Sequence, residues 1–241
     1  LKSITGYRRW QETNAGATFG ELTTFRTLSP TFAVVTDTGY PFTAQNERTH
    51  EQFTQEVQLN GQFGEKVAGG DRVNFALGGY SFADRGSERN ISSLIFATDV
   101  PFFGPLGFNF VNPFAYNTTS KSWAVFGQGS FTPNILNDKL RLTAGLRYSA
   151  DEKETTLFNS TTVFVPVRAY AKDKFNALTY LAKAQYFFTD DLNAYVSHSK
   201  GYKAGGFNTR GNLEKFRPET LYSYEAGVKA TMFDRRLQAN I

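Results

Sequence analysis

Aromatic side chains that could bind a ligand gather in the segment Phe96–Tyr116. Three prolines, Pro101, Pro105 and Pro113, limit the freedom of this segment. Rings on a stiffened segment suit planar or apolar ligands, although the same rings could simply pack on one another. The aromatic candidates for ligand binding are Phe102, Phe103, Phe108, Phe110 and Tyr116, and Phe114 lies among them.

A second segment, Gly201–Glu219, mixes aromatic rings with cations. Guanidinium groups bind oxygen-rich anions through paired hydrogen bonds, so this mixture predicts affinity for an anionic ligand. The alternatives are a structural turn or solvated charges. The candidate residues are Tyr202, Lys203, Phe207, Asn208, Arg210 and Arg217.

Catalytic and metal-binding patterns are weak. His50 and His198 are the only histidines, they lie far apart in the sequence, and neither has a carboxylate at convincing spacing. The serines beside His198 would point to the opposite face of a strand. Cysteine is absent, and the glycine-rich segment lacks the Lys-Ser/Thr of a phosphate-binding loop. We therefore expect no enzyme, no metal site and no cofactor.

The element that organises these residues is a strand over Leu140–Ser149, where apolar and polar residues alternate. It is about ten residues long, whereas strands of soluble sheets usually have about five or six. About nine to eleven tilted residues cross a bilayer, and a lipid-facing Arg costs roughly 2–4 kcal/mol near the midplane. The alternation therefore predicts a membrane strand with its leucines in lipid and Arg141 and Arg147 facing a polar lumen.

The other predicted strands alternate in the same way, and Lys183, Glu225 and Lys229 join the two arginines on the lumen side. We expect these five charges to pair with one another or with a part of the protein outside this sequence. The strands are predicted over Leu1–Trp10, Phe53–Gln62, Arg72–Phe82, Ser122–Phe131, Leu140–Ser149, Phe175–Phe188, Leu192–Lys200 and Thr220–Thr231, with a ninth from Arg236.

Connections between these strands alternate strictly between long and short, which is typical of an antiparallel meander with one plain and one elaborate end. Aromatic residues of the apolar faces lie near strand ends, where a membrane-interface belt belongs. The sequence thus predicts an all-β fold, an antiparallel transmembrane β-barrel with long extracellular loops and short periplasmic turns. A soluble sandwich with the same apolar faces as its core is the alternative. The belt residues are Trp123, Phe131, Tyr148, Tyr186, Phe188, Tyr222 and Tyr224.

Composition agrees with such a barrel. The 241 residues include 24 Phe and 12 Tyr, more than an average core needs, and the net charge of +4 is scattered. Without a block of Lys or Arg, nucleic-acid binding is not expected. No run approaches 18 apolar residues, so no transmembrane helix is predicted. The sequence starts and stops in mid-strand, and nine strands leave two open edges, so we expect a piece of a longer chain.

Several stretches resemble TonB-dependent outer-membrane receptors. These are the strand pair SWAVFGQGS (122–130) and LRLTAGLRYSADEKE (140–154), NAYVSHSKGYKAGGFN (193–208) with FRPET (216–220), and SYEAGVK (223–229). FTQEVQL (53–59) and ITGYR (4–8) fit the same barrel. The GYKAGGFN and RPET pair is fairly specific, whereas the strand patterns alone would not be.

The resemblance implies a barrel of about 22 strands closed by an N-terminal plug. Residues 1–241 would form about nine of those strands, without plug or TonB box. It implies a Gram-negative outer-membrane receptor, in contact with membrane lipid, that imports an iron–siderophore complex. Energy would come from the TonB complex only through a plug missing here. Import of a glycan or cobalamin, a passive porin, and a soluble β-rich binding module remain alternatives.

Overall fold

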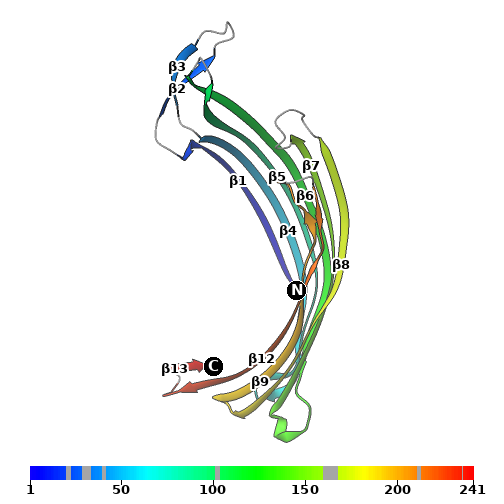
Figure 1. Cartoon of the computed structure of the whole chain (residues 1–241). Helices are drawn as coiled ribbons and strands as arrows, with labels where there is room; N and C mark the ends of the chain where they lie inside the picture. The colour runs from blue at the N-terminus through cyan, green and yellow to red at the C-terminus, as the bar shows by residue number, and fades with distance from the viewer. Residues whose placement is uncertain are drawn as a thin grey trace.

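The computed structural model describes residues 1–19, 23–28, 34–39, 42–100, 104–159, 168–210, 213–234 and 236–241. The described chain forms an open, strongly curved antiparallel sheet whose main strands follow one another in sequence order (Figure 1). The order in the sheet is β1 (Lys2–Phe19), β4 (Phe42–Val67), β5 (Gly70–Val100), β6 (Gly104–Phe131), β7 (Leu140–Asn159), β8 (Ala169–Thr189), β9 (Leu192–Lys203), β12 (Glu219–Met232) and β13 (Leu237–Asn240).

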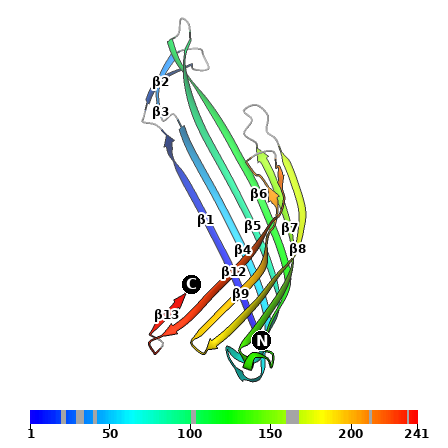
Figure 2. The same cartoon turned by 60° about the horizontal axis from the view of Figure 1, so that its bottom comes forward.

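Smaller elements lie at both ends of this sheet. The hairpin of β2 (Thr23–Leu28) and β3 (Val34–Gly39) touches β6, and β10 (Gly206–Phe207) pairs with β11 (Lys215–Phe216). A 3₁₀ turn, η1 (Leu136–Asp138), connects β6 to β7. None of the helical structure found in the described ranges has the length and apolarity needed to span a membrane. Figure 2 shows the short turns gathered at one end and the tall strands rising toward the other.

The two faces of the sheet differ sharply. Cross-strand partners share a face, and the pairs Phe131–Leu142, Val125–Tyr148 and Val57–Gly79 place the apolar set together. Leu146 is 59 % exposed and Val125 53 %, whereas Arg141 on the other face is only 7 % exposed. Side chains converge on a concave surface and diverge on a convex one, so the apolar set forms the outward face and the polar set lines the lumen.

The predicted fold is confirmed: it is part of an antiparallel barrel, in one layer, with the predicted strand order. The alternative sandwich is wrong, because no second layer of the described chain covers Leu142, Leu146 or Val228, all of which remain exposed. Val196 belongs to the outward face and Tyr195 to the lumen, which settles a facing that the sequence left ambiguous.

The predicted long loops are wrong over much of their length. Most of the long connection expected between residues 83 and 121 is strand, because β5 and β6 pair continuously from Val73–Phe131 up to Val100–Gly104. Similarly, β7 continues to Asn159 and β8 begins at Ala169. Above Lys121 apolar and polar residues occur on both faces, so the alternation that indicates a strand disappears although the backbone ladder continues.

Aromatic residues mark two rows on the outward face. One row includes Trp123 and Tyr148, whose ring centroids lie 5.6 Å apart, and the other includes Tyr186 and Phe188, 5.1 Å apart. The span from Lys121 to Phe131 covers roughly 25 Å for a strand tilted by about 40°. This equals the height of the apolar band that such barrels present.

Arg72 organises the end with short turns. Its guanidinium donates to the Thr132 carbonyl oxygen at 2.9 Å and pairs with Asp138 at 2.9 Å and Glu65 at 2.6 Å. Next to it, Gly69 adopts φ +83°, and a Cβ there would lie 2.5 Å from the Phe187 ring. A side chain at position 69 would therefore both strain the turn and displace a buried ring.

The Arg72 hydrogen bond lowers the pKa of Asp138 below its ordinary value. A carboxyl with a depressed folded-state pKa stabilises the fold above its unfolded pKa, and that contribution disappears as the pH falls through the folded value. We expect Asp138→Asn to remove this acid-dependent component from the thermal stability of the full-length receptor between about pH 5 and 2. Asp234→Asn, in another turn, is the control; identical pH profiles for both variants would contradict the assignment.

Candidate ligand site at the mouth of the lumen

The hairpin β10–β11 and its flanking residues fold onto the lumen wall at the tall end of the sheet. Two consecutive glycines allow this close approach: a Cβ on Gly205 would lie 2.5 Å from the Phe216 carbonyl oxygen, and one on Gly206 would meet the Phe216 ring. The Asn208 amide donates to the Glu214 carbonyl oxygen at 2.9 Å, and the Asn208 side chain accepts from the Arg210 amide at 3.1 Å. The segment is therefore a folded structure in its own right.

A small apolar cluster anchors this segment. Leu213, 7 % exposed, packs with Phe114 of β6 and Leu157 of β7, which are 4 % and 0 % exposed. Tyr116 and Phe207 pack against the cluster. Burial of three large side chains away from water stabilises the docked arrangement by several kcal/mol, at roughly 1.5–3 kcal/mol per side chain.

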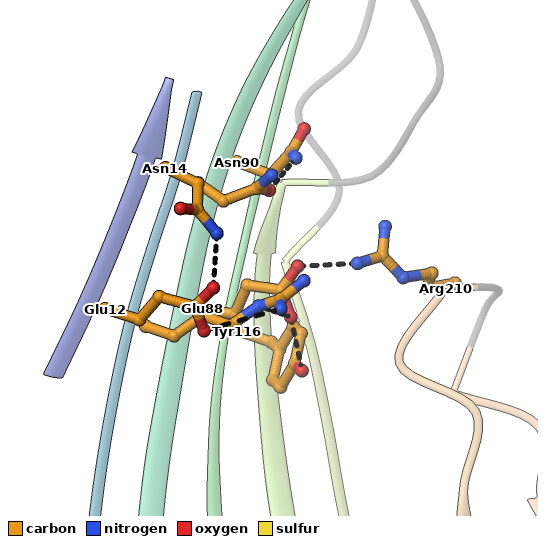
Figure 3. A network of polar contacts seen from close by, with 8 residues as sticks. Glu12, Asn14, Glu88, Asn90, Tyr116 and Arg210 are labelled. Atoms are coloured by element: carbon orange, nitrogen blue, oxygen red, sulfur yellow. Dashed lines mark hydrogen bonds and ion pairs between the residues drawn. The ribbon is translucent and has the colours of Figure 1, made fainter. Parts of the chain in front are cut away.

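Glu88 of β5 is the centre of a polar network beside this cluster (Figure 3). Its carboxylate is almost fully buried and is approached by Arg210 at 2.5 Å, the Tyr116 hydroxyl at 2.8 Å and Arg48 Nε at 3.4 Å. Arg48 also reaches Glu12 of β1 at 3.9 Å, and Asn14 donates to Glu12. The network thus links β1, β4, β5 and β6 to the folded hairpin segment.

Burial explains why Glu88 needs these partners. An isolated carboxylate at such a position would be strongly disfavoured, whereas two guanidinium groups and a phenol donor compensate it. Burial also raises the pKa of Tyr116, and its hydrogen bond to Glu88 acts in the same direction, so the phenol stays protonated and donates.

Part of the Arg210 side chain remains exposed at the mouth of the lumen. Its side chain is 59 % exposed, one nitrogen contacts Glu88, and the guanidinium lies 5.1 Å from the Phe114 ring centroid. Lys215 pairs with Asp173 and lies 5.5 Å from the Phe175 ring centroid. The hairpin therefore presents two oriented cations at the mouth, each held by a carboxylate and an aromatic face.

The predicted aromatic candidates separate into three groups. Tyr116 belongs to the Glu88 network, whereas Phe102 and Phe103 lie outside the described residues. Phe108 and Phe110 lie in β6, but their side chains are likewise outside the described part. The structure thus brings one of these five together with the second predicted segment.

The six candidates predicted in the segment Gly201–Glu219 also occupy different positions. Phe207, Asn208 and Arg210 belong to the folded hairpin segment. Lys203 forms an exposed ion pair with Glu219 at 3.3 Å, and Arg217 is exposed. The Tyr202 hydroxyl oxygen, at the end of β9, is buried. Their part in ligand binding stays a prediction.

The five predicted lumen charges contact aromatic rings and backbone more than one another. Arg141 donates to the Asp71 carbonyl oxygen at 3.2 Å, and Arg147 lies 5.4 Å from the Tyr80 ring centroid. Lys183, Lys229 and Glu225 converge on one ring. The two ammonium groups lie 4.6 and 5.5 Å from the Tyr195 centroid, and the Tyr195 hydroxyl donates to Glu225.

Sequence reasoning missed several residues of this wall. Glu88, Arg48 and Glu12 were not identified because their proximity comes from cross-strand pairing within segments expected to be loops. The pairing also gives His50 a carboxylate partner, Asp84, against the expectation that it has none. The His50 ring stacks on Trp10 with centroids 5.8 Å apart. If the strand alternation of β5 had been extended beyond Phe82, it would have placed residues 84, 86, 88 and 90, and with them Asp84 and Glu88, on the lumen face.

A family model described as TonB dependent receptor-like, beta-barrel matches residues 2–241. The chain belongs to the TonB-dependent receptor family. This family comprises receptors and transporters rather than enzymes, and its barrels are outer-membrane proteins.

Solved structures support the same fold. The chain is similar to the ferric yersiniabactin uptake receptor FyuA from Yersinia pestis, with a TM-score of 0.65 and 17 % identity over 95 % of this chain and 31 % of that one. It also resembles the siderophore receptor PiuA from Acinetobacter baumannii (TM-score 0.56, 13 % identity, 99 % and 39 %). The ferric-catecholate import receptor Fiu from K12 E. coli gives a TM-score of 0.51 at 14 % identity (99 % and 37 %). The chain thus spans about a third of these receptors.

We predict that Glu88 holds the β10–β11 hairpin segment against the lumen wall. Replacing Glu88 by Gln leaves two guanidinium groups facing a neutral amide. Because both arginines are partly exposed to water, losing these charged hydrogen bonds costs on the order of 1.5–3 kcal/mol. We expect amide hydrogen exchange of residues 204–217 in the full-length receptor to accelerate by at least tenfold. Glu219→Gln removes an exposed pair worth about 1 kcal/mol or less and is the matched control. Equal exchange in both variants would refute the role of Glu88.

Proposed function

We propose that the receptor to which this chain belongs imports ferric siderophore complexes across the bacterial outer membrane. The observation that carries this proposal is the exposed Arg210 guanidinium at the lumen mouth, flanked by Phe114 and Tyr116. Ferric siderophore complexes are often anionic and oxygen-rich, which suits oriented cations beside aromatic rings. The three solved receptors described above are named for siderophore or iron uptake, which supports the same ligand class.

The placement in the membrane follows from the outward face. Its apolar band, bounded by aromatic rows, has the height of a hydrocarbon layer, and charged side chains begin at Lys121 and Glu152. The tall end, with the ligand site, would face the outside of the cell and the short turns would face the periplasm. The strands would form part of a multi-pass barrel completed by other parts of the receptor.

Energy for uptake would come from the TonB complex through a plug domain that this sequence does not include. The lumen wall that would meet the plug carries Arg141, Arg147, Lys183 and Lys229 against Glu225, so a plug surface rich in carboxylates would complement it. We therefore expect these lumen charges to form ion pairs with the plug.

A substitution on the outward face tests the membrane placement. Leu146→Arg puts a charge near the centre of the apolar band and should destabilise the inserted barrel by roughly 2–4 kcal/mol. Gln128→Arg on the lumen face, at nearly the same height, is the control and should insert normally. The measurement is the folded fraction of full-length receptor in lipid vesicles. Equal insertion of both variants would contradict the assignment of the two faces.

Uptake of labelled iron tests the transport proposal. Cells that lack their own siderophore receptors would carry the full-length gene and receive catecholate, hydroxamate and phenolate complexes of radioactive iron. We expect saturable, energy-dependent uptake of at least one complex. Uptake of a glycan or cobalamin with no iron uptake from any panel member would overturn the proposed ligand class.

The same assay tests Arg210. Arg210→Gln removes the cation that faces the lumen, and losing one charged hydrogen bond to the ligand should raise the half-saturation concentration by about tenfold. Arg85→Gln removes a cation from the outward face and should leave uptake unchanged. An unaltered half-saturation concentration for Arg210→Gln would exclude Arg210 from the ligand site.

A further inference from the structure

The positive charges of the ligand site are already matched by carboxylates. Glu88 contacts Arg210 at 2.5 Å and Arg48 at 3.4 Å, and Arg48 also reaches Glu12 at 3.9 Å (Figure 3). This network therefore joins two guanidinium groups to two carboxylates. Its charges cancel, although the Arg210 side chain is 59 % exposed and still offers N–H groups to a ligand.

Two lysines at the mouth are paired in the same way. Lys215 of the hairpin segment forms an ion pair with Asp173 of β8, and Lys203 of β9 meets Glu219 of β12 at 3.3 Å. Opposite charges this close together act as a dipole, whose field falls off faster than that of a single charge and is screened by salt within about 8 Å. The lysines can thus direct hydrogen bonds at a ligand while adding little net charge.

The remaining charged residues of this wall also balance. We consider the described residues that face the lumen from the pair Ser122–Asp151 upward, together with segment 204–217. The remaining charges there are Arg8, Lys153 and Arg217 against Asp84, Asp151 and Glu214. His50, the partner of Asp84, adds a charge only when it is protonated. The described wall therefore carries no surplus of positive charge.

A hollow formed by the hairpin has the same balance. Its volume is about 420 Å³, which is typical of a small-molecule site. Two phenyl rings and two neutral polar side chains surround one cation and one carboxylate. The lining residues are Phe207, Asn208, Thr209, Glu214, Lys215 and Phe216.

Neutral groups lie beside the ion pairs. Asn14, Asn46 and Asn90 are direct partners across β1, β4 and β5, so their amides form one row on the lumen face. Four residues lower on β1, Trp10 stacks on His50 with ring centroids 5.8 Å apart. Amides and an indole ring suit a molecule that is uncharged but rich in hydrogen-bonding groups, because such a molecule loses little hydration energy when it binds.

Ferric siderophore complexes differ in net charge. Three hydroxamates, each of which loses one proton, neutralise Fe³⁺, whereas three catecholates, each of which loses two, leave a trianion. A trianion would give up hydration at a wall that has no surplus positive charge to compensate it, whereas a neutral complex would not. The geometry points to an uncharged ferric complex of the hydroxamate class as the ligand of this mouth. This inference rests on the proposed function and narrows its ligand class.

Equilibrium binding to the full-length receptor in detergent, followed by quenching of tryptophan fluorescence, tests the inference. The probes are a neutral ferric cyclic trihydroxamate, the same trihydroxamate bearing three carboxylates, and a ferric tricatecholate. We expect the neutral complex to bind at least about tenfold more tightly than either trianion. Its affinity should change by less than about twofold between about 0.05 and 0.5 M NaCl, because salt screens an uncharged ligand little.

A variant with surplus positive charge tests the cause. Asp173→Asn removes the partner of Lys215 but keeps the lysine, so the affinity for both trianions relative to the neutral complex should rise by roughly threefold or more. Glu152→Gln removes a carboxylate from the outward face and is the matched control, for which this ratio should stay as in the unaltered receptor.

Two outcomes would overturn the inference and leave the transport proposal standing. One is equal or tighter binding of the trianions by the unaltered receptor, and the other is the same affinity ratio in Asp173→Asn and in Glu152→Gln. A receptor that binds and imports no ferric complex at all would overturn the proposed function and this inference with it.

Discussion

The pairing of neighbouring strands imposes one constraint on the entire molecule, because residues joined across an antiparallel ladder must share a face. Leu142 can face outward only if Phe131 and Ala184 do as well, and Arg141 then has to face the lumen with Gln185. A slip by one residue would exchange the faces of a whole strand. The apolar band, the charged lumen wall and the position of Glu88 all follow from this shared register.

The sequence was most informative where the two faces differ in polarity. Over Leu140–Ser149 apolar and polar residues alternate without exception, so both the strand and its facing could be predicted. Above the apolar band the two faces no longer differ consistently in polarity, and Thr49, Ser87 and Thr119 carry no periodic signal although all lie in strands. Backbone hydrogen bonds are the same in both regions. A strand can be recognised from the sequence, however, only where its two faces differ in burial and therefore in residue type.

The candidate site could likewise be predicted only in part from the sequence. Arg210 and Phe207 were identified because aromatic rings and cations cluster locally in the chain. Glu88 lies 122 positions away from Arg210, and no local pattern connects them. Their contact depends on the register of four strands and on two glycines that let the hairpin segment approach the wall. Proximity of this kind is a property of the folded sheet, and it becomes predictable only once the pairing is known.

The height of β5 and β6 has a further consequence. These strands continue as a paired ladder far past the apolar band, so much of the mouth is hydrogen-bonded sheet. A ligand that binds to such a wall meets groups already fixed in position, and little conformational entropy is lost when they close around it. Preorganisation of this sort lets a few contacts give high affinity.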